Sequence, residues 1–535
     1  MMKFNIFPLG GLLPAVLLSL AAASAGAASF RVQCPNSTSL HPLVNGQANP
    51  AIKCQQISGG DGFATMGDGS QIYLFAFGPL SGIADLRNGL PGTEPASIFN
   101  QIGDSAAVGD PLTTNFNGAV GLVPDPEATT CAQPDTTTAT GCLDGHVDPR
   151  PIMDVGVMNG NEPSPTFAID EDDEFFLTLT NVGMIMRPDL FEQHTVHFHG
   201  YPNASAFYDG VPEPSVAINI GGSMTYYYLA PDAGTYMWHC HITPPEHLQM
   251  GMVGQVYVRP RQNRVPLGQS LYAGLVAQQS DPRTACYPQT DSTHSDPDIL
   301  CSAPLPATDN GAVHTNNLAG HPTLYTYNDG DGSTAYDVEY PIQIHGFDPT
   351  FHFVGMTFNP EPFTDMKDKY FLLNGRSYPD TISNANYIAG WTPYGSMTTQ
   401  STDGTMHASQ PLPTLINIPA GGKALLRISD LDVTEEETLA SLGIPMHVIG
   451  YNAKILRDQA GNSMAYDTNS VTLGGGESLD LILDASDTTK YHAGQTFYLY
   501  SPNLDHLSND AENFGGLMTE VHICNAVDPQ TKACS

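Results

Sequence analysis

Two short segments hold most of the side chains in this sequence that bind metals well. Residues 194–200 read His-Thr-Val-His-Phe-His-Gly, and residues 238–241 read Trp-His-Cys-His. His247 and Met252 follow within a few positions. Six of the chain's 18 histidines fall between positions 194 and 252. Because imidazole, thiolate and thioether groups are all metal ligands, this concentration predicts a metal site.

The order of the residues sorts these candidates onto two faces. In a β-strand, side chains at i and i+2 share a face, while those at i and i+1 or i and i+3 are opposed. His239 and His241 therefore point to one side of their strand, and Cys240 points to the other. If the two segments pair as strands, the face opposite Cys240 presents four imidazoles: His197, His199, His239 and His241.

The face of Cys240 presents a different set. It carries His194, and the loop that follows can add His247 and Met252. Two imidazoles, a thiolate and a thioether form the soft, near-trigonal set with a weak axial sulfur that is typical of a blue, electron-transferring copper. Zinc is the main competitor, but structural zinc seldom uses methionine and no Cys-x-x-Cys motif accompanies Cys240. The four imidazoles opposite suit further copper ions, one peptide step away.

The composition indicates which elements position these residues. The chain has 535 residues, with 52 Gly and 43 Pro, and 14% of its residues are charged. This balance suits many short strands joined by turns, so we predict an all-β fold. At roughly 150 residues per domain, the length allows more than one hydrophobic core.

The patterning divides the chain into successive parts. We expect a loop-rich N-terminal extension over 29–151, with one strand at 71–77, followed by a first β-sandwich over 152–262 that carries the metal motifs. A linker over 263–335 then leads to a second β-rich unit over 336–525 and a tail over 526–535. The strands predicted in the two units are 174–180, 215–220, 223–229, 234–239 and 254–258, then 423–428, 445–449, 478–483 and 496–499. A capping box at Thr434 and Glu437 predicts one helix, over 433–442.

The net charge of the chain and its first 28 residues indicate where the protein is located and which partners it can have. With 19 basic and 55 acidic residues the formal charge is −36, which disfavours a nucleic-acid partner. Residues 1–28 combine a basic start, an apolar run and a small-x-small site, so they predict a signal peptide and a periplasmic or extracellular protein. No later segment is long and apolar enough to predict a membrane span.

Eight of the nine cysteines fall into four sequence-adjacent pairs. In an exported chain such pairs are plausible disulfides, although sequence alone does not determine their connectivity. Examples are Cys131 with Cys142, Cys286 with Cys301, and Cys524 with Cys534. Cys240 is left over, in agreement with a role as a metal ligand.

The histidine and cysteine segments resemble the copper motifs of the multicopper oxidase superfamily, whose domains have the cupredoxin fold. Residues 158–166 and 207–210 also resemble family motifs, and the resemblance covers about 110 residues strongly. It extends weakly over the second unit, where residues 374–379 and 475–480 look like the family's copper-free middle domain. Two cupredoxin-like sandwiches are therefore expected.

The resemblance implies a role for each candidate. The implied type 1 copper ligands are His194, Cys240 and His247, with Met252 axial. The implied ligands of a type 2/type 3 centre are His197, His199, His239 and His241. Asp209 would be a proton donor. The implied activity is a multicopper oxidase that takes single electrons from a small phenolic or metal-ion reductant and reduces dioxygen to water.

The sequence departs from the family in its histidine count. A full trinuclear centre in the family needs eight histidines, and only four occur here in His-x-His pairs. Two copies of this domain packed face to face would supply the missing half, so a homo-oligomer that completes the copper cluster is one hypothesis. The stretch from Cys240 to His247 is also two residues longer than the usual oxidase loop.

Two alternatives remain open. A copper nitrite reductase-like enzyme would use His199 and His239 with histidines of the second unit, for which His447 and His506 are candidates. That scheme leaves His197 and His241 without a role. A non-enzymatic copper-binding electron-transfer protein would keep only the type 1 site, and it would not need the second histidine group.

Overall fold

The computed structural model describes residues 32–102, 116–123, 145–201, 205–230, 232–278, 305–355, 362–382, 398–400, 406–408, 412 and 414–535. The predicted signal peptide at 1–28 lies outside these residues, as do the cysteine pairs 131/142 and 286/301. Strands dominate the described part of the chain, which confirms the predicted all-β fold. Disulfides join Cys34 to Cys54 and Cys524 to Cys534, and Cys240 is a free, buried cysteine.

Two sheets form the first sandwich. One sheet has the order β2 (Gln71–Pro79), β1 (Ile52–Thr65), β5 (Glu174–Gly183) and β7 (Ser223–Leu229), with β3 (Glu94–Pro95) paired to β1. The other has the order β4 (Phe167–Asp170), β9 (Val253–Arg259), β8 (Gly234–His239) and β6 (His197–His199). Their inner faces share one core, in which Trp238 stacks on Phe167 with ring centroids 4.4 Å apart.

The N-terminal region is therefore not a separate loop-rich extension. Strand β1 pairs in parallel with β5, and β2 pairs with β1, so both belong to the first sandwich. The sequence Gly59-Gly60-Asp61-Gly62 hid β1, because glycine and aspartate are depleted in strands. Close packing requires glycine here: a β-carbon on Gly62 would lie 2.0 Å from the carbonyl oxygen of Gly160.

The second unit is also a sandwich. One sheet has the order β13 (Tyr370–Leu373), β12 (Val338–Phe347), β17 (Lys423–Asp430), β23 (Ser478–Asp484), β19 (Met446–Tyr451) and β20 (Lys454–Ile455), with β21 (Tyr466–Thr468) paired to β19. The facing sheet has the order β16 (Ile416–Pro419), β25 (Met518–Cys524), β24 (Thr496–Tyr500), β18 (Glu437–Leu442) and β22 (Ser470–Leu473). A second aliphatic core lies between them.

Two local predictions were wrong. Residues 433–442 do not form a helix, because Glu437–Leu442 is strand β18, which pairs with β22 and β24. The capping-box side chains have other partners: the Thr434 hydroxyl donates to Asp368, and the Glu437 carboxylate contacts His506. Residues 215–220 do not form a regular strand either, and only Ile218 makes a bridge, to His194.

Shorter elements complete the described chain. The helices are α2 (Ile83–Arg87), α3 (Ala96–Phe99), α4 (Pro149–Gly156), α5 (Pro244–Gln249), α6 (Leu271–Gln278) and α7 (Pro349–Gly355). The strand pairs β10 (Leu324–Tyr325) with β11 (Ala335–Tyr336), and β14 (Thr398–Gln400) with β15 (Met406–Ala408), stand apart from the large sheets. None of the helices described is long and apolar enough to traverse a membrane.

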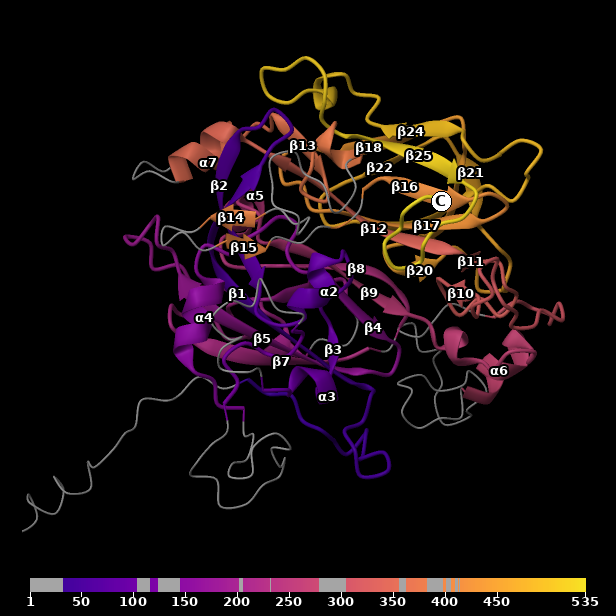
Figure 1. Ribbon diagram of the computed structural model, residues 1–535, viewed down its shortest axis with the longest axis horizontal. Helices are drawn as coiled ribbons and strands as arrows, with labels where there is room; N and C mark the ends of the chain where they lie inside the picture. The colour runs from indigo at the N-terminus through magenta and orange to yellow at the C-terminus, as the bar shows by residue number, and fades with distance from the viewer. Residues whose placement is uncertain are drawn as a thin grey trace, which may run out of the picture.

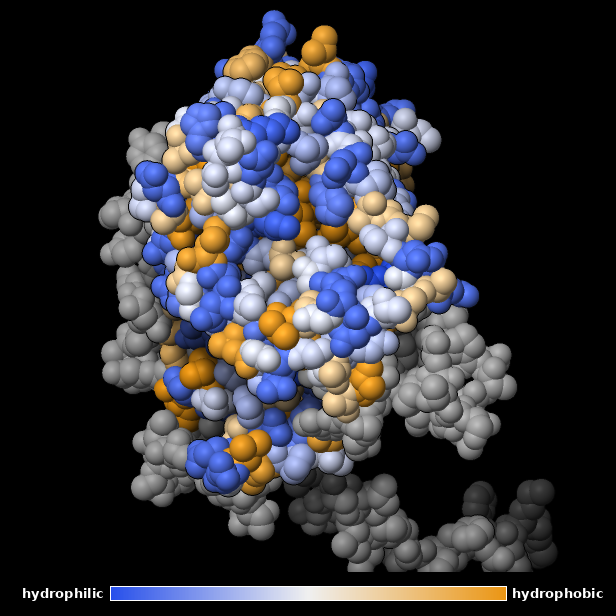
Figure 2. Space-filling view, turned by 90° about the vertical axis from the view of Figure 1, so that its right-hand side faces the viewer, coloured by the Kyte–Doolittle hydropathy of each residue, from blue (hydrophilic) through white to orange (hydrophobic). Residues whose placement is uncertain are grey.

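The two sandwiches pack on each other through β8 and β9. Figure 1 shows the first sandwich in indigo and magenta at the lower left and the second in orange and yellow at the upper right. Buried polar contacts join them: the Thr235 hydroxyl donates to Asp480 over 2.6 Å, and the Gln255 amide donates to the carbonyl of Arg427 over 2.9 Å. On the face seen in Figure 2, hydrophilic and hydrophobic residues are interspersed.

Candidate metal centre

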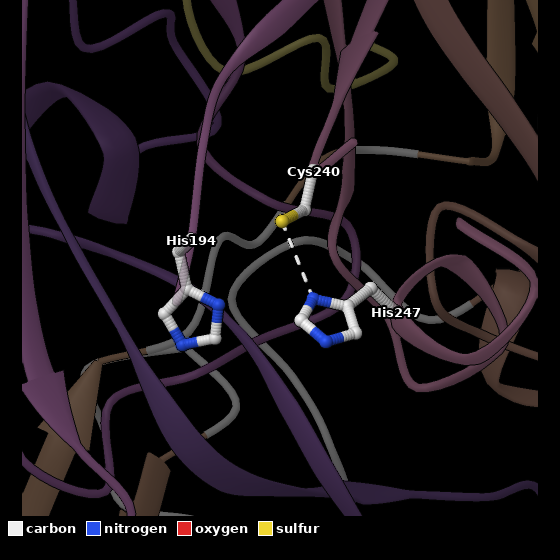
Figure 3. A group of neighbouring side chains, drawn as sticks. All are labelled: His194, Cys240 and His247. Atoms are coloured by element: carbon white, nitrogen blue, oxygen red, sulfur yellow. Dashed lines mark hydrogen bonds between the residues drawn. The ribbon is translucent and has the colours of Figure 1, made fainter. Parts of the chain in front are cut away.

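Three buried side chains converge near the end of β8. Possible ligand atoms of His194, Cys240 and His247 lie within 4.8 Å of one another, and all three residues are buried. Figure 3 shows the three side chains, with the sulfur of Cys240 facing the His247 ring. The Nδ1 atom of His247 is 3.2 Å from this sulfur. The structure thus brings together three of the four ligands predicted for a type 1 copper.

Different elements supply these side chains. His194 lies before β6 and is held by backbone bonds to Ile218, and Cys240 follows β8 directly. His247 lies on α5, which begins with Pro244 and Pro245, residues whose fixed backbone suits the first turn of a helix. The expected loop between Cys240 and His247 therefore contains a short helix.

Met252 borders the same group through its backbone. Its N–H donates to the carbonyl of His247 over 2.9 Å, and its carbonyl accepts from the N–H of Cys240 over 3.1 Å. The side chain is fully buried in the core cluster that includes Cys240. These bonds hold the Met252 backbone next to the backbones of both Cys240 and His247.

The environment of Cys240 favours the thiolate. Burial alone would raise the pKa of the thiol, but the positive charge and hydrogen bonds of His247 and His194 outweigh it and hold the pKa well below its usual range. Burial would conversely lower the pKa of His247, but the Cys240 thiolate and Glu192 raise it to about 9. The backbone N–H of Thr195 also donates to the sulfur, over 3.4 Å.

The first sheet covers this group. The Phe75 ring on β2 meets the His247 ring edge-on at 5.2 Å, and a β-carbon on Gly59 of β1 would lie 2.8 Å from the His194 ring. Glu192 approaches the far side of His247, with its carboxylate 3.5 Å from Nε2. The β1–β2 hairpin, of which only β2 was predicted from the sequence, therefore helps to exclude water from the group.

The second histidine group lies on the other side of β6 and β8. These strands pair with His197 opposite His239, as the predicted side-by-side arrangement requires. Possible ligand atoms of His197, His199 and His239 lie within 4.8 Å of one another. His241 lies beside them, with its ring centroid 5.0 Å from that of His197. All four line one cavity of about 530 Å³.

Backbone carbonyls orient these rings. The His239 Nδ1–H donates to the carbonyl of Cys240 over 2.8 Å, and the His197 Nδ1–H donates to the carbonyl of Asp209 over 2.7 Å. Both bonds leave Nε2 for a ligand. Burial lowers the pKa of His197, of His199 and of His239, the last to about 3. The rings are therefore neutral, which is the form that binds metal ions.

Asp209 lies behind His197 and is not among the residues that line the cavity. Its carboxylate is 3.5 Å from the His197 Nδ1 atom, next to the carbonyl that accepts the bond from the same nitrogen. The arrangement suits positioning of the ring better than direct contact with a cavity ligand.

The second sandwich forms the opposite wall of the cavity. This wall consists of Leu431, Asp432, Val433, Thr434, Glu435, Glu436, Gly475 and Gly476. A β-carbon on Gly476 would lie 3.1 Å from the His199 Nε2 atom, so the wall approaches the imidazoles closely. No histidine of the second sandwich is among the described residues that line the cavity.

The histidines of the second unit have other partners. His447 is partly exposed on β19 and contacts Asp467 over 2.8 Å. His506 is buried between Glu435 and Glu437, at 3.1 and 2.8 Å. Neither lines the cavity, so the ligand set that a nitrite reductase arrangement would need is not assembled within the described chain.

The donor chemistry fits copper. Both ring nitrogens of His194 and the Nε2 atom of His247 are buried without hydrogen-bond partners in the described structure. Leaving an imidazole nitrogen unpaired in a protein interior is costly, and a metal ion beside the thiolate would satisfy one ring nitrogen of His194. Residues 194–252 thus provide two adjacent sets of metal donors.

Sequence reasoning missed several residues around the two groups. Thr195 contacts both sides, because its N–H donates to Cys240 and its hydroxyl accepts from the N–H of His241 over 3.0 Å. Its position next to His194 was the only signal available. Phe75 and Asp432 lie far away in the sequence, and no local pattern marks them.

Comparisons with known proteins agree with this site. Residues 144–263 match the family model described as multicopper oxidase. A laccase of Aspergillus fumigatus, abr2, is 35% identical over 109 residues, which is 20% of this chain and 17% of that protein. Multicopper oxidase MCE of Talaromyces pinophilus is 33% identical over 116 residues, 21% of this chain and 18% of that protein.

Among solved structures, the blue copper oxidase of Nitrosomonas europaea aligns over 88% of this chain and 85% of its own, with 15% identity and a TM-score of 0.46. Multicopper oxidase mgLAC aligns over 90% of this chain and 93% of its own, with 14% identity and a TM-score of 0.47.

The predicted resemblance to the multicopper oxidases is therefore confirmed for the segment that carries both metal groups. The chain matches less than a fifth of the length of the two curated relatives named above.

Proposed function

We propose that this protein is a copper-dependent oxidoreductase of the multicopper oxidase type. It takes single electrons from a small phenolic or metal-ion reductant and uses them to reduce dioxygen to water. The observation that carries the proposal is the pair of donor groups on opposite sides of β6 and β8, separated by the single peptide link between His239 and Cys240.

Each group has its proposed metal. His194, Cys240, His247 and Met252 would hold a type 1 copper. His197, His199, His239 and His241 hold copper of the type 2 and type 3 kind. Copper in these two environments supplies one-electron transfer and dioxygen reduction. The covered position of His247 keeps water from the first group, and the carbonyl of Asp209 holds His197 toward the cavity.

Copper loading of the purified protein tests the proposal. We expect a blue absorption band from the Cys240 thiolate, a type 2 signal in the electron paramagnetic resonance spectrum, and oxygen consumption with a phenol or an oxidisable metal ion. Cys240→Ser should abolish the blue band and turnover. His447→Ala is the control, because His447 lies outside both groups. Oxygen consumption that survives in Cys240→Ser would refute the proposal.

The same material separates the alternatives. A nitrite reductase-like enzyme would produce nitric oxide from nitrite, and His447→Ala or His506→Ala would impair it. An electron-transfer protein would turn blue without consuming oxygen. His447 contacts Asp467, His506 contacts Glu435 and Glu437, and neither is among the described residues that line the cavity, which favours the oxidase.

A homo-oligomer that completes the cluster is a further proposal, and the structure sets a condition on it. Asp432, Thr434 and Gly476 of the same chain already form the opposite wall of the cavity, so a second copy would have to bring its ligands in from another side. Copper stoichiometry measured with the sedimentation mass over a range of protein concentrations tests it. Stoichiometry that rises with association would support shared copper, and a constant single copper per chain would exclude it.

We also infer that the protein is exported to the periplasm or the extracellular space. The proposal rests on the pattern of residues 1–28, and the disulfide between Cys34 and Cys54 suits an oxidising compartment. N-terminal sequencing of the secreted protein should find a mature end near Ala28.

A further inference from the structure

Two buried aspartates meet in the wall of the histidine cavity, and neither belongs to a copper motif. Asp432 follows β17 and lines the cavity. Asp368 precedes β13 and lies directly behind it. Each residue is 3% exposed. A pair of carboxyl groups in this position has no part in the core of the second sandwich, whose cluster is aliphatic and aromatic.

Gly346 makes room for their close approach. If this glycine carried a β-carbon, that atom would lie 2.3 Å from an oxygen of Asp368 and 2.4 Å from an oxygen of Asp432. The two Oδ2 atoms therefore share the space that a side chain would occupy in most strands. Gly346 needs no special backbone angle here, so the space itself is the reason for glycine.

Donors satisfy the other carboxylate oxygens. The Gln249 amide donates to Oδ1 of Asp368 over 3.0 Å, and the Thr434 hydroxyl donates to Oδ2 of the same residue. The backbone N–H groups of Thr434 and Glu435 donate to Oδ1 of Asp432, over 2.7 and 3.2 Å. Oδ2 of Asp432 has no donor while both groups are ionised.

No cation compensates two negative charges at this point. Neither aspartate forms an ion pair with lysine or arginine in the described part of the chain. Among the described residues, His345, Asp430 and Glu437 interact with the charge of Asp432, and burial lowers the pKa of His345. Two adjacent buried carboxylates without a cation cannot both ionise, so they hold one proton between them.

The pKa of Asp368 is shifted in the direction that the geometry implies. Burial first, and then the charge of Asp432 and a hydrogen bond with it, raise the pKa of Asp368 well above its usual range. At neutral pH the proton on Asp368 supplies the donor that Oδ2 of Asp432 otherwise lacks. The pair is therefore most stable with one proton.

We propose that the Asp368–Asp432 pair stores a proton in the wall of the histidine cavity and releases it into the cavity. The release rests on the proposed oxidase function. Reduction of one dioxygen to two water molecules consumes four electrons, which the reductant supplies, and four protons. The pair relays protons one at a time through Asp432. Each proton that leaves is replaced from solvent through the exposed Glu436 at the same cavity, so the two carboxylates are not ionised together.

Infrared spectroscopy of the copper-free full-length protein tests the stored proton. A protonated carboxylic acid has a carbonyl stretching band that shifts in heavy water, and the carboxylate lacks it. We expect Asp368→Asn to lose one such band at neutral pH. Asp432→Asn should shift the band, because burial keeps Asp368 protonated while its hydrogen bond to the Asp432 carboxylate is lost. Glu162→Gln is the matched control: Glu162 is buried, with a pKa raised well above its usual range by burial, so this variant should lose a different band. Unchanged spectra in both aspartate variants would overturn the proposal.

Oxygen consumption by the copper-loaded protein tests the release. We expect kcat in Asp368→Asn to fall by about tenfold or more, with a larger solvent deuterium isotope effect, while KM for the reductant and the blue band stay unchanged. Glu162→Gln should keep the wild-type rate and isotope effect. A variant with wild-type kcat and isotope effect would overturn the release step. Wild-type protein that turns blue but consumes no oxygen would refute the proposed function instead, and the infrared result would still decide whether the pair holds a proton.

Discussion

A buried thiol is ordinarily protonated and unreactive, because a low-dielectric environment disfavours its charged form. Cys240 departs from this rule through its neighbours. His194 and His247 stabilise the thiolate, and the Thr195 N–H donates to the same sulfur. The site is therefore already charged in the way that a copper ion requires, before any metal binds.

Because the Cys240 thiolate is stabilised before any metal binds, we can predict how this thiol titrates in the copper-free protein. The ultraviolet absorbance of the Cys240 thiolate should persist well below about 8.5, the ordinary pKa of a cysteine. In His247→Ala the effect of burial should dominate and raise the pKa, so the thiolate absorbance should disappear at neutral pH. Cys240→Ser supplies the baseline. Thiolate absorbance that is equal in wild type and His247→Ala would contradict this account.

The strand pair β6–β8 determines how the two donor groups are related. His197 lies opposite His239 in the register, and Trp238 lies opposite Gly254 on the other neighbour, β9. Because the side chains of a strand alternate, burial of Trp238 in the core turns His239 toward the cavity. Packing of one large ring thus sets the orientation of His239 and, by alternation along the chain, of Cys240.

Gly254→Ala tests this coupling. A β-carbon at Gly254 would lie 2.5 Å from Trp238, so the ring must move, and we expect a loss of about 1–3 kcal/mol in the free energy of unfolding. The blue band of the copper-loaded variant should also shift, since β8 leads directly into Cys240. Gly474→Ala is the control, because the nearest atom to its added β-carbon is 3.8 Å away. Equal stability of the two variants in denaturant titrations would argue against the coupling.

The molecule as a whole carries a strong negative charge, −36, and many of its carboxyl groups are buried. Burial raises the pKa of Glu94 to about 8, and those of Asp173 and Glu437 to about 7. At these three groups the folded protein therefore holds more protons than the unfolded chain up to about pH 8. The stability that these groups contribute is present at low pH and is lost as the pH rises through 7 to 8.

Two buried histidines make the folded state more stable as the pH rises, but this effect is confined to pH values below about 6.5. Burial lowers the pKa of His239 to about 3 and of His352 to about 4, so their contribution is complete above the ordinary value of 6.5. We therefore expect Tm of the copper-free protein to fall between pH 6.5 and 8, measured by calorimetry. Glu94→Gln should reduce the fall. A Tm that rises over this range would show that the buried carboxyl groups are not protonated in the folded state.

Local sequence determined the donor groups and the strands that carry them. The alternation of side chains is a property of a single strand, so the division of the histidines between two faces follows from their spacing alone. For the same reason the predicted strands at 223–229 and 234–239 coincide with β7 and β8. The all-β fold followed from composition, since turn-forming residues are frequent and charged residues are few.

Only the tertiary structure decided what surrounds the donors. Strand β1 was hidden because its glycines are there for contacts with distant residues, and the predicted helix at 433–442 is a strand because its partners lie elsewhere in the chain. The cavity wall around Asp432 and the space beside Gly346 depend on how the second sandwich packs against the first. Such contacts join residues far apart in the chain, and no periodicity within a segment encodes them.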